Sequence, residues 1–325
     1  MSDYYLGIDG GGTSTRALLA NNEGRVCGIG TAGSSNYHHA GVDGTARALV
    51  EVIDTALNQA NVDRNQLTSI FLGMAGVVNR SDHEAIERAI EPLGLTPKTK
   101  VGIGHDIRIA LTGGLAGASG IALIAGTGSS CYGRNESGHA VQCGGWGALV
   151  DDVGSAYWMG VEALKAAVRQ ADGRLPPSNL RETIFRAIEI DDIRDFLARV
   201  HGTGMKRDEI ATLAPVVMDL VRAGDATAAG ILAAGTEGLA EMVQTAADRL
   251  GLHEPPVVVS GGLWSSGEPF QSHLCEAIRR RVPKAAMQTA TLTPVQGAAL
   301  EARRLVRDDA EDRFLESLNK GLLPC

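Results

Sequence analysis

The same succession of strands and turns occurs twice in this chain of 325 residues. Each copy has three apolar runs, which are 4–8, 16–20 and 25–31 in the first copy and 120–125, 130–134 and 139–144 in the second. A glycine-rich turn joins the first two runs of each copy, and an Asn/Glu/Gly turn joins the last two. Because self-similarity of this kind indicates repeated structural units, we expect two related domains. The alternative is that two glycine turns align by chance.

The residues after each repeat predict α/β architecture. Helical spacing alternates with short apolar runs in the order 41–60, 69–73, 82–93 and 100–104. A meander of three strands followed by such alternation predicts a mixed sheet covered on both faces by helices. In the second half, 155–252 is largely helical, and the later elements are expected at 257–260, 270–282, 286–289, 295–305 and 307–320.

This order of elements predicts three parts of the chain. We expect a first domain at 1–115 and a second at 116–300 that contains a helical insertion. The Gly/Ala-rich segment 112–119 marks the boundary between them. The remainder, 301–325, is expected to form a C-terminal helix that packs back on the first domain.

Composition narrows the class of protein. Glycine makes up 41 of 325 residues, about 13%, but it follows no Gly-X-Y period, and no long segment lacks apolar residues. Collagen-like and disordered chains are therefore excluded. The net charge of −8 argues against nucleic acid or an acidic membrane as the main partner.

The cysteines and the N-terminus favour a cytoplasmic protein. The five cysteines form no CxxC pair and no zinc-binding spacing, so we expect reduced thiols at Cys27, Cys131, Cys143, Cys275 and Cys325. The N-terminus resembles no signal peptide, and the apolar runs are too short to span a bilayer.

The glycine turns are the candidate phosphate-binding elements. The chain contains no P-loop, no dinucleotide-binding GxGxxG and no GxSxG or HExxH motif. The first turn reads Asp9-Gly10-Gly11-Gly12-Thr13, in which glycines let backbone N–H groups approach an anion and Thr13 adds a hydroxyl. Asp9, at a strand end, is placed to hold a hydrated Mg²⁺. An ordinary hairpin turn explains the same residues.

Two further glycine motifs strengthen this interpretation. Gly126-Thr127-Gly128-Ser129 occupies the equivalent turn of the second copy. The strand 257–260 leads into Gly261-Gly262, where an adenine ring can lie against the backbone. Each motif alone is a plausible plain turn, but the three in this order favour a nucleotide site.

This set resembles the sugar kinase/Hsp70/actin superfamily of ATPases, which carries two phosphate hairpins, an adenosine motif and two connecting helices. Gly297-Ala298-Ala299-Leu300 is similar to the second connecting helix. Gly144-Gly145-Trp146-Gly147 and the residues Asp152–Trp158, DVGSAYW, are most similar to the N-acetylglucosamine kinases of the BadF/BadG type, relatives of the acyl-CoA dehydratase and reductase activators. The resemblance implies two ribonuclease-H-like (actin-like ATPase) domains with mixed sheets that flank a central nucleotide and sugar cleft.

The resemblance also implies roles for individual residues. Asp106 is the expected catalytic base; it follows the strand 100–104 at its carboxyl end, although an Asp that caps the next helix has the same position. His105 is not assigned a role. The implied sugar-binding residues are Asn36, Tyr37, Gly76, Asp106, Ser129, Ser130, Gly145, Trp146, Gly147 and Asp152. The implied nucleotide-binding residues are Gly11, Gly12, Thr13, Gly126, Thr127, Gly128, Gly261, Gly262 and Ser266, with Ala211 or Ala214 in a helix over the base, and Asp9 is the metal residue.

The expected function is therefore ATP- and Mg²⁺-dependent phosphorylation of the 6-hydroxyl of N-acetylglucosamine or a close hexosamine. Departures from the family pattern at Tyr37, Ser130 and Val153 leave the sugar's 2-substituent open, so glucosamine remains an alternative. A competing function is that of an ATPase activator with an iron–sulfur cluster on paired cysteines, and a third is that of a sugar sensor without catalysis. The family also suggests a homodimer.

Overall fold

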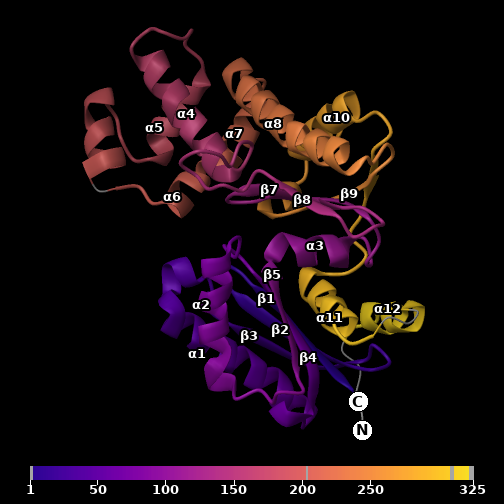
Figure 1. The fold of residues 1–325 in the computed structure, drawn as a ribbon. Coiled ribbons are helices and arrows are strands. Elements are labelled where there is room, and N and C mark those ends of the chain that lie inside the picture. Colours follow the sequence, from indigo (N-terminus) through magenta and orange to yellow (C-terminus); the bar gives the residue numbers. More distant parts are fainter. Residues whose placement is uncertain (1–2, 203, 308–310, 322–325) are drawn as a thin grey trace. The chain divides into compact units, whose positions relative to one another are not determined.

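The computed structural model describes residues 3–202, 204–307 and 311–321 and divides the chain into two compact units. Unit 1 comprises Met1–Ala118 and Thr289–Cys325, and unit 2 comprises Ser119–Gln288. Each unit contains one five-stranded mixed sheet (Figure 1).

The sheet of unit 1 has the strand order β3-β2-β1-β4-β5. The strands are β1 (Tyr4–Gly10), β2 (Thr15–Asn21), β3 (Val26–Ala32), β4 (Leu67–Met74) and β5 (Lys100–His105). The first three form the predicted antiparallel meander, and β4 and β5 continue the sheet parallel to β1. The sequence therefore predicted the strands of this sheet to within a few residues at each end.

Helices cover both faces of this sheet, as expected. They are α1 (Tyr37–Ala60), α2 (Arg80–Ile90), α3 (Asp106–Gly114), α11 (Pro294–Arg304) and α12 (Asp312–Asn319), with 3₁₀ turns at Arg64–Gln66 and Glu91–Leu93. Leu6 and Ile8 of β1 pack with α1 and α2, whereas Tyr5, on the opposite face, packs with α3, α11 and α12. Figure 1 shows this arrangement of helices on either side of the unit 1 sheet.

The boundary expected at residue 300 lies instead at 288–289. Helix α11, most of which falls in the expected second domain that ended at residue 300, packs directly on β1 of unit 1. A Cβ atom added to Gly7 of β1 would lie 2.2 Å from the backbone nitrogen of Ala299, so only glycine permits this close approach. The segment expected as a helix at 307–320 contains α12, and its residues 308–310 lie outside the described part of the chain.

The sheet of unit 2 repeats the order of the first, as β8-β7-β6-β9-β10. Its strands are β6 (Gly120–Ala125), β7 (Ser129–Arg134), β8 (Ala140–Cys143), β9 (Pro256–Ser260) and β10 (Ala286–Gln288). Strand β6 pairs antiparallel with β7 and parallel with β9, as β1 pairs with β2 and β4. The internal repeat in the sequence thus corresponds to two sheets of the same topology.

The predicted helical insertion lies between β8 and β9. Its elements are α4 (Ala156–Ala171), α5 (Asn179–Ala187), α6 (Arg207–Ala211), α7 (Leu213–Arg222) and α8 (Ala226–Leu250), with short 3₁₀ and π turns at Ile193–Asp195 and Ala198–Gly202. After β9 come α9 (Gly262–Ser265) and α10 (Phe270–Arg281). Most of these helices share one aliphatic core with the sheet of this unit.

The expectation that all five cysteines are reduced thiols is wrong at one described position. Cys131, Cys143 and Cys275 are free, but Cys27 is disulfide-bonded. Cys325 lies outside the described residues. No helix in the described ranges is both long enough and apolar enough to cross a bilayer.

Candidate functional site

Three parallel strands of unit 1 end at the same edge of its sheet. Gly10 of β1 pairs with Met74 of β4, and Met74 pairs with His105 of β5. The residues that follow these strands therefore converge, which is the usual position of ligands in open α/β sheets. This edge collects Asp9, the first glycine turn, Gly76 and Asp106.

The first glycine turn, 10–14, is held in place by backbone hydrogen bonds. The N–H of Gly11 donates to the carbonyl of Ser14 at 3.0 Å, and the N–H of Ser35 donates to the carbonyl of Gly11 at 3.3 Å. A Cβ atom at Gly10 would lie 2.5 Å from Sδ of Met74, whereas one at Gly12 would contact nothing. Gly12 and Thr13 are exposed, so their backbone and hydroxyl groups are accessible to a ligand.

Asp9 is a partly buried carboxylate next to a second one. Burial raises the pKa of Asp9 to about 6, the charge of Asp106 adds to this rise, and Arg16 opposes it. A cation at this position would offset both the burial of the carboxylate and its repulsion from Asp106. The described ranges contain no group of three or more His, Cys, Asp or Glu side chains arranged for a metal. Mg²⁺ needs no such group, because it commonly uses one or two carboxylates together with water and phosphate oxygens.

The carboxylate of Asp106 lies beside the ring of His105. Asp106 is the first residue of α3, and the helix is capped by His105, whose Nδ1 accepts the N–H of Ile107 at 3.2 Å. The same Nδ1 lies 2.7 Å from Oδ1 of Asp106, so the two side chains form an ion pair when the imidazole is protonated. Apart from this ring, the buried Oδ1 has no hydrogen-bond partner in the described part of the chain. The capping alternative thus belongs to His105, and the Asp106 carboxylate is not used as the cap.

Asn36 and Gly76 come together at this edge, and His38 joins them. Asn36 caps α1 by accepting the N–H of His38 at 3.1 Å. Nε2 of His38 lies 3.2 Å from the carbonyl oxygen of Gly76, and the ring leaves no room for a Cβ there. Sequence reasoning missed His38, although a capping Asn two residues before a His signals that both lie at the start of one helix.

Tyr37 is directed to a structural partner. Its hydroxyl donates to Oδ1 of Asp82, near the start of α2. Burial, together with this carboxylate, raises the pKa of Tyr37 to about 12. The hydroxyl proton is therefore already engaged, so a sugar contact through Tyr37 would have to use the hydroxyl oxygen as an acceptor or the ring.

In unit 2, the second glycine turn is tied to the start of α4. The N–H of Gly126 donates to the carbonyl of Gly128 at 2.9 Å. The N–H groups of Ala156 and Tyr157 donate to the carbonyls of Gly126 and Thr127 at 2.8 and 3.3 Å. Because the first N–H groups of α4 bind these carbonyl oxygens, the turn is held in place at the end of the hairpin formed by β6 and β7.

Ser129 and Ser130 differ in the way their hydroxyls are satisfied. Oγ of Ser129 donates to the carbonyl of Val153 at 2.9 Å. Oγ of Ser130 is buried without a partner among the described residues and would lie 2.5 Å from a Cβ at Gly145. Ser130 and Gly145 therefore adjoin, and Gly145 adopts a φ of 80° that suits glycine.

The loop that carries Trp146 is open to solvent. The N–H of Trp146 donates to Oδ2 of Asp151 at 3.2 Å, and its side chain is 61% exposed. Leu149 and Val150 of the same loop are exposed as well. Asp151 thus holds the backbone of this loop, and Gly147 follows Trp146 with a φ of 96°.

Asp152 is buried and binds two groups of unit 2. Oδ1 accepts the N–H of Ser129 at 3.4 Å, and Oδ2 pairs with the guanidinium of Arg207. Desolvation raises the pKa of Asp152, and Arg207 and the Ser129 N–H oppose this rise. Arg207 was not singled out from the sequence, because it lies 55 residues further along the chain.

The predicted adenosine motif adjoins the second glycine turn. Gly261 has a φ of 106°, and a Cβ there would lie 2.4 Å from the carbonyl oxygen of Ala125. Gly262 is exposed, and Ser266 donates its hydroxyl to the carbonyl of Leu263 at 2.6 Å. Ala214 is fully buried in α7 and cannot face a base, which leaves Ala211 as the partly exposed candidate.

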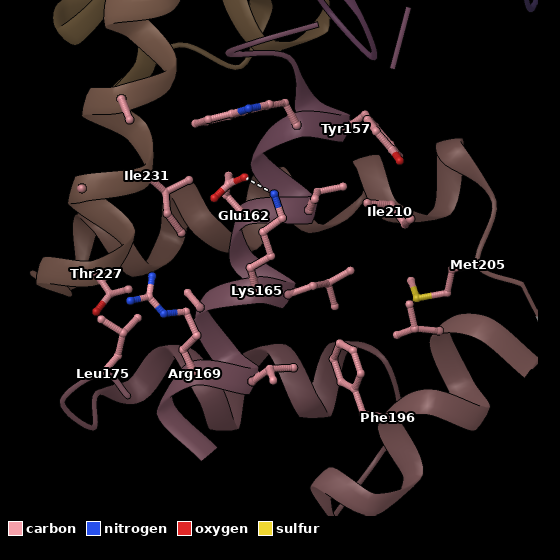
Figure 2. A pocket seen from close by; sticks show the side chains of 18 of the residues that line it. Tyr157, Glu162, Lys165, Arg169, Leu175, Phe196, Met205, Ile210, Thr227 and Ile231 are labelled. Atoms are coloured by element: carbon pink, nitrogen blue, oxygen red, sulfur yellow. Dashed lines mark hydrogen bonds and ion pairs between the residues drawn. The ribbon is translucent and has the colours of Figure 1, made fainter. Parts of the chain in front are cut away.

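A separate cavity of about 790 Å³ lies among the helices of unit 2 (Figure 2). It is lined by α4, α8 and part of 196–210, and Glu162 pairs there with Lys165 at 2.7 Å. None of the predicted sugar or nucleotide residues lines it.

Comparisons with known proteins identify the family of this chain. Residues 6–302 match the model of the BadF/BadG/BcrA/BcrD ATPase family. The N-acetylmuramic acid/N-acetylglucosamine kinase of Clostridium acetobutylicum is 30% identical over 302 residues, which cover 92% of this chain and 98% of the relative. The N-acetyl-D-glucosamine kinase of Dictyostelium discoideum is 28% identical, with 92% and 98% covered.

A solved structure shows the same fold. A candidate N-acetylglucosamine kinase from Chromobacterium violaceum superposes with a TM-score of 0.70 at 25% identity, and the match covers 91% of this chain and 98% of that one. The expected actin-like architecture of two mixed-sheet units is thereby confirmed.

Proposed function

Since the chain belongs to the BadF/BadG/BcrA/BcrD ATPase family, we propose that it is an ATP-dependent amino-sugar kinase that phosphorylates the 6-hydroxyl of N-acetylglucosamine or a close hexosamine. The observation that carries the proposal is the carboxylate of Asp106, which does not cap α3 and lies at the carboxyl end of β5, beside Asp9 and the first glycine turn.

Asp106 acts as the general base in this proposal. Its carboxylate accepts the proton of the sugar hydroxyl and orients that oxygen toward the γ-phosphate. Phosphoryl transfer depends mainly on positioning and on stabilising charge, so one aligned carboxylate suffices for the proton. Asn36, Gly76, Ser129, Ser130, Gly145, Trp146, Gly147 and Asp152 are the proposed sugar-binding positions; His38 joins them because its ring contacts Gly76.

The nucleotide is proposed to bind at glycine turns. Backbone N–H groups around Gly11, Gly12, Gly126 and Gly128, with the hydroxyls of Thr13 and Thr127, would donate to phosphate oxygens. Gly261, Gly262 and Ser266 are the proposed adenosine positions, since Gly261 abuts the Ala125 carbonyl beside the second turn. Asp9, supported by Asp106, would hold Mg²⁺, which when bound neutralises charge on the phosphates.

The activator function receives no support from the paired cysteines. Cys131 and Cys143 face each other across β7 and β8, and both are buried. Burial raises the pKa of both thiols, whereas cluster ligation needs thiolates. The kinase interpretation is therefore preferred.

Release of ADP with a panel of sugars tests the proposal. The panel contains N-acetylglucosamine, glucosamine, N-acetylmannosamine and N-acetylmuramic acid, and a reaction without sugar is the control. We expect sugar-dependent ADP release, strongest with N-acetylglucosamine, and a product phosphorylated at the 6-hydroxyl. Activity on glucosamine with none on N-acetylglucosamine would replace our first choice of sugar, and ADP release that no sugar stimulates would contradict the kinase itself.

A further inference from the structure

Arg207 reaches the second glycine turn from the helical insertion. It is the first residue of α6, and its Nη2 would lie 2.5 Å from a Cβ atom at Gly128. The guanidinium thus occupies the space beside Gly128 that any larger residue would fill. Both residues belong to unit 2.

A buried carboxylate fixes the guanidinium in this place. The Asp152 side chain is 4% exposed, and its Oδ2 pairs with Nη2 of Arg207 while Oδ1 accepts the Ser129 N–H. Asp152 also has a φ of 61°, a left-handed conformation that residues other than glycine rarely adopt. Backbone strain of this kind persists only where surrounding contacts enforce it, and it concentrates at functional sites.

The pair has a structural part, because the buried Asp152 carboxylate would be left uncompensated without Arg207. That part does not account for the rest of the guanidinium, since the Arg207 side chain is 45% exposed. In the described part of the chain, Asp152 is the one hydrogen-bond partner of Arg207, although a guanidinium has five N–H donors. The guanidinium also lies over the ring of Tyr157, 5.9 Å from its centroid, which further restricts its position. The Arg207 guanidinium is therefore an oriented cation beside the second glycine turn, and some of its N–H groups have no hydrogen-bond partner among the described residues.

We propose that Arg207 binds an oxyanion of the substrates at Gly128, and that Asp152 is its positioning residue. The oxyanion is a phosphoryl oxygen of the nucleotide or the carboxylate of an acidic amino sugar, because a guanidinium fork matches both groups. The inference rests on the proposed kinase function. It also gives Asp152 a second role besides the proposed contact with sugar.

Steady-state kinetics of Arg207→Gln and Arg207→Lys test the proposal, with N-acetylglucosamine as the neutral sugar and N-acetylmuramic acid as the acidic one. If the anion is a phosphoryl oxygen, the Gln variant loses about 10- to 100-fold in kcat with both sugars, the loss expected for one charge-assisted hydrogen bond. If the anion is a carboxylate, kcat/KM falls by a similar factor with the acidic sugar alone. Lys, which keeps the charge without the fork, recovers part of the loss in either case.

A structural role predicts a different result. It would lower the thermal midpoint of Arg207→Gln and leave kcat and KM of the folded enzyme within twofold of the wild type for both sugars, which would overturn the proposal. Arg194→Ala is the matched control, because Arg194 lies in the same insertion and its exposed side chain pairs with Asp192. Should the Gln variant fail to fold, the Lys variant carries the same comparison.

The test also separates this inference from the proposed function. A wild-type protein that releases no ADP with any amino sugar would refute the kinase. Calorimetric binding of AMPPNP and of N-acetylmuramic acid would then decide the role of Arg207. Weaker binding of either ligand by Arg207→Gln supports the oxyanion site, and unchanged binding of both rejects it.

Discussion

At the scale of single residues, the two carboxylates of unit 1 have different environments. Asp106 lies beside the ring of His105 and does not cap its helix, whereas Asp9 has its pKa raised to about 6 by burial and by Asp106. A carboxylate that is not used as a cap can receive a proton from a substrate, and a carboxylate with a raised pKa is stabilised by a cation. Each leads to a measurable prediction.

Replacing Asp106 with Asn removes the proton acceptor and keeps the shape. His105 supplies the cap of α3, so the helix should remain intact. We expect kcat to fall by about 10²–10⁴-fold while nucleotide still binds, as measured by ADP release and by calorimetry. Asp43→Asn, at an exposed position of α1, is the control. Near-normal turnover of the Asp106 variant would contradict its role as the base.

Replacing Asp9 with Asn should stabilise the ligand-free protein in a pH-dependent way. The folded pKa of about 6 exceeds the ordinary value of 3.8, so the ionised carboxylate destabilises the fold. This cost is absent below pH 4, grows between pH 4 and 6 and is complete above 6. Urea unfolding should therefore show a gain of about 2–3 kcal/mol at pH 8 that shrinks toward pH 4. An equal difference in unfolding free energy between variant and wild type at both pH values would contradict the pKa assignment. We also expect the Asp9 variant to bind Mg²⁺-nucleotide more weakly.

At the scale of elements, the position of Asp106 depends on how α3 is held against α11. The carboxylate of Glu301 in α11 is 3% exposed and accepts hydrogen bonds from Nε of Arg108 at 3.0 Å and from Oγ1 of Thr112 at 2.6 Å. Arg108 lies two residues after Asp106, so this buried contact fixes the first turn of α3. Helix α3, which carries Asp106, is thus positioned by α11, near the end of the chain.

Glu301→Gln should loosen this contact. We expect a loss of about 1–3 kcal/mol of stability in urea unfolding, because a buried charge-assisted hydrogen bond is replaced by a neutral one. A lower kcat should accompany it if α3 moves with Asp106. Glu316→Gln, exposed on α12, is the matched control and should change neither quantity. Unfolding midpoints that are equal for the two variants would show that Glu301 does not anchor α3.

At the scale of the whole molecule, unit 1 is assembled from both ends of the chain. Its sheet is formed by residues before 118, but one face is covered by α11 and α12, which follow residue 289. Tyr5 and Phe71 of the sheet are buried in a cluster that includes Leu300 and Phe314. Unit 1 therefore cannot complete its core until the chain has passed through unit 2.

A chain that ends at Gln288 should lose the fold of unit 1. The large apolar face over β1 and β4 would be exposed to water, at a cost of about 25 cal/mol for each Å². A chain that ends at Val306 keeps α11 but not α12 and should fall between this variant and the full protein. Urea unfolding, monitored by circular dichroism, ranks the stability of the three chains. Equal stability would show that α11 and α12 do not complete the core of unit 1.

The sequence by itself determined the elements of both sheets, the glycine turns, and the positions of Asp9 and Asp106 at the ends of their strands. It could do so because strand alternation, turn residues and parallel strand ends are local or topological properties. The tertiary structure decided which sheet α11 covers, that His105 rather than Asp106 caps α3, that Tyr37 is engaged by Asp82, and that Arg207 stands at Gly128. These depend on contacts between segments distant in sequence, whose energies come from close packing and from buried charge that no local pattern encodes.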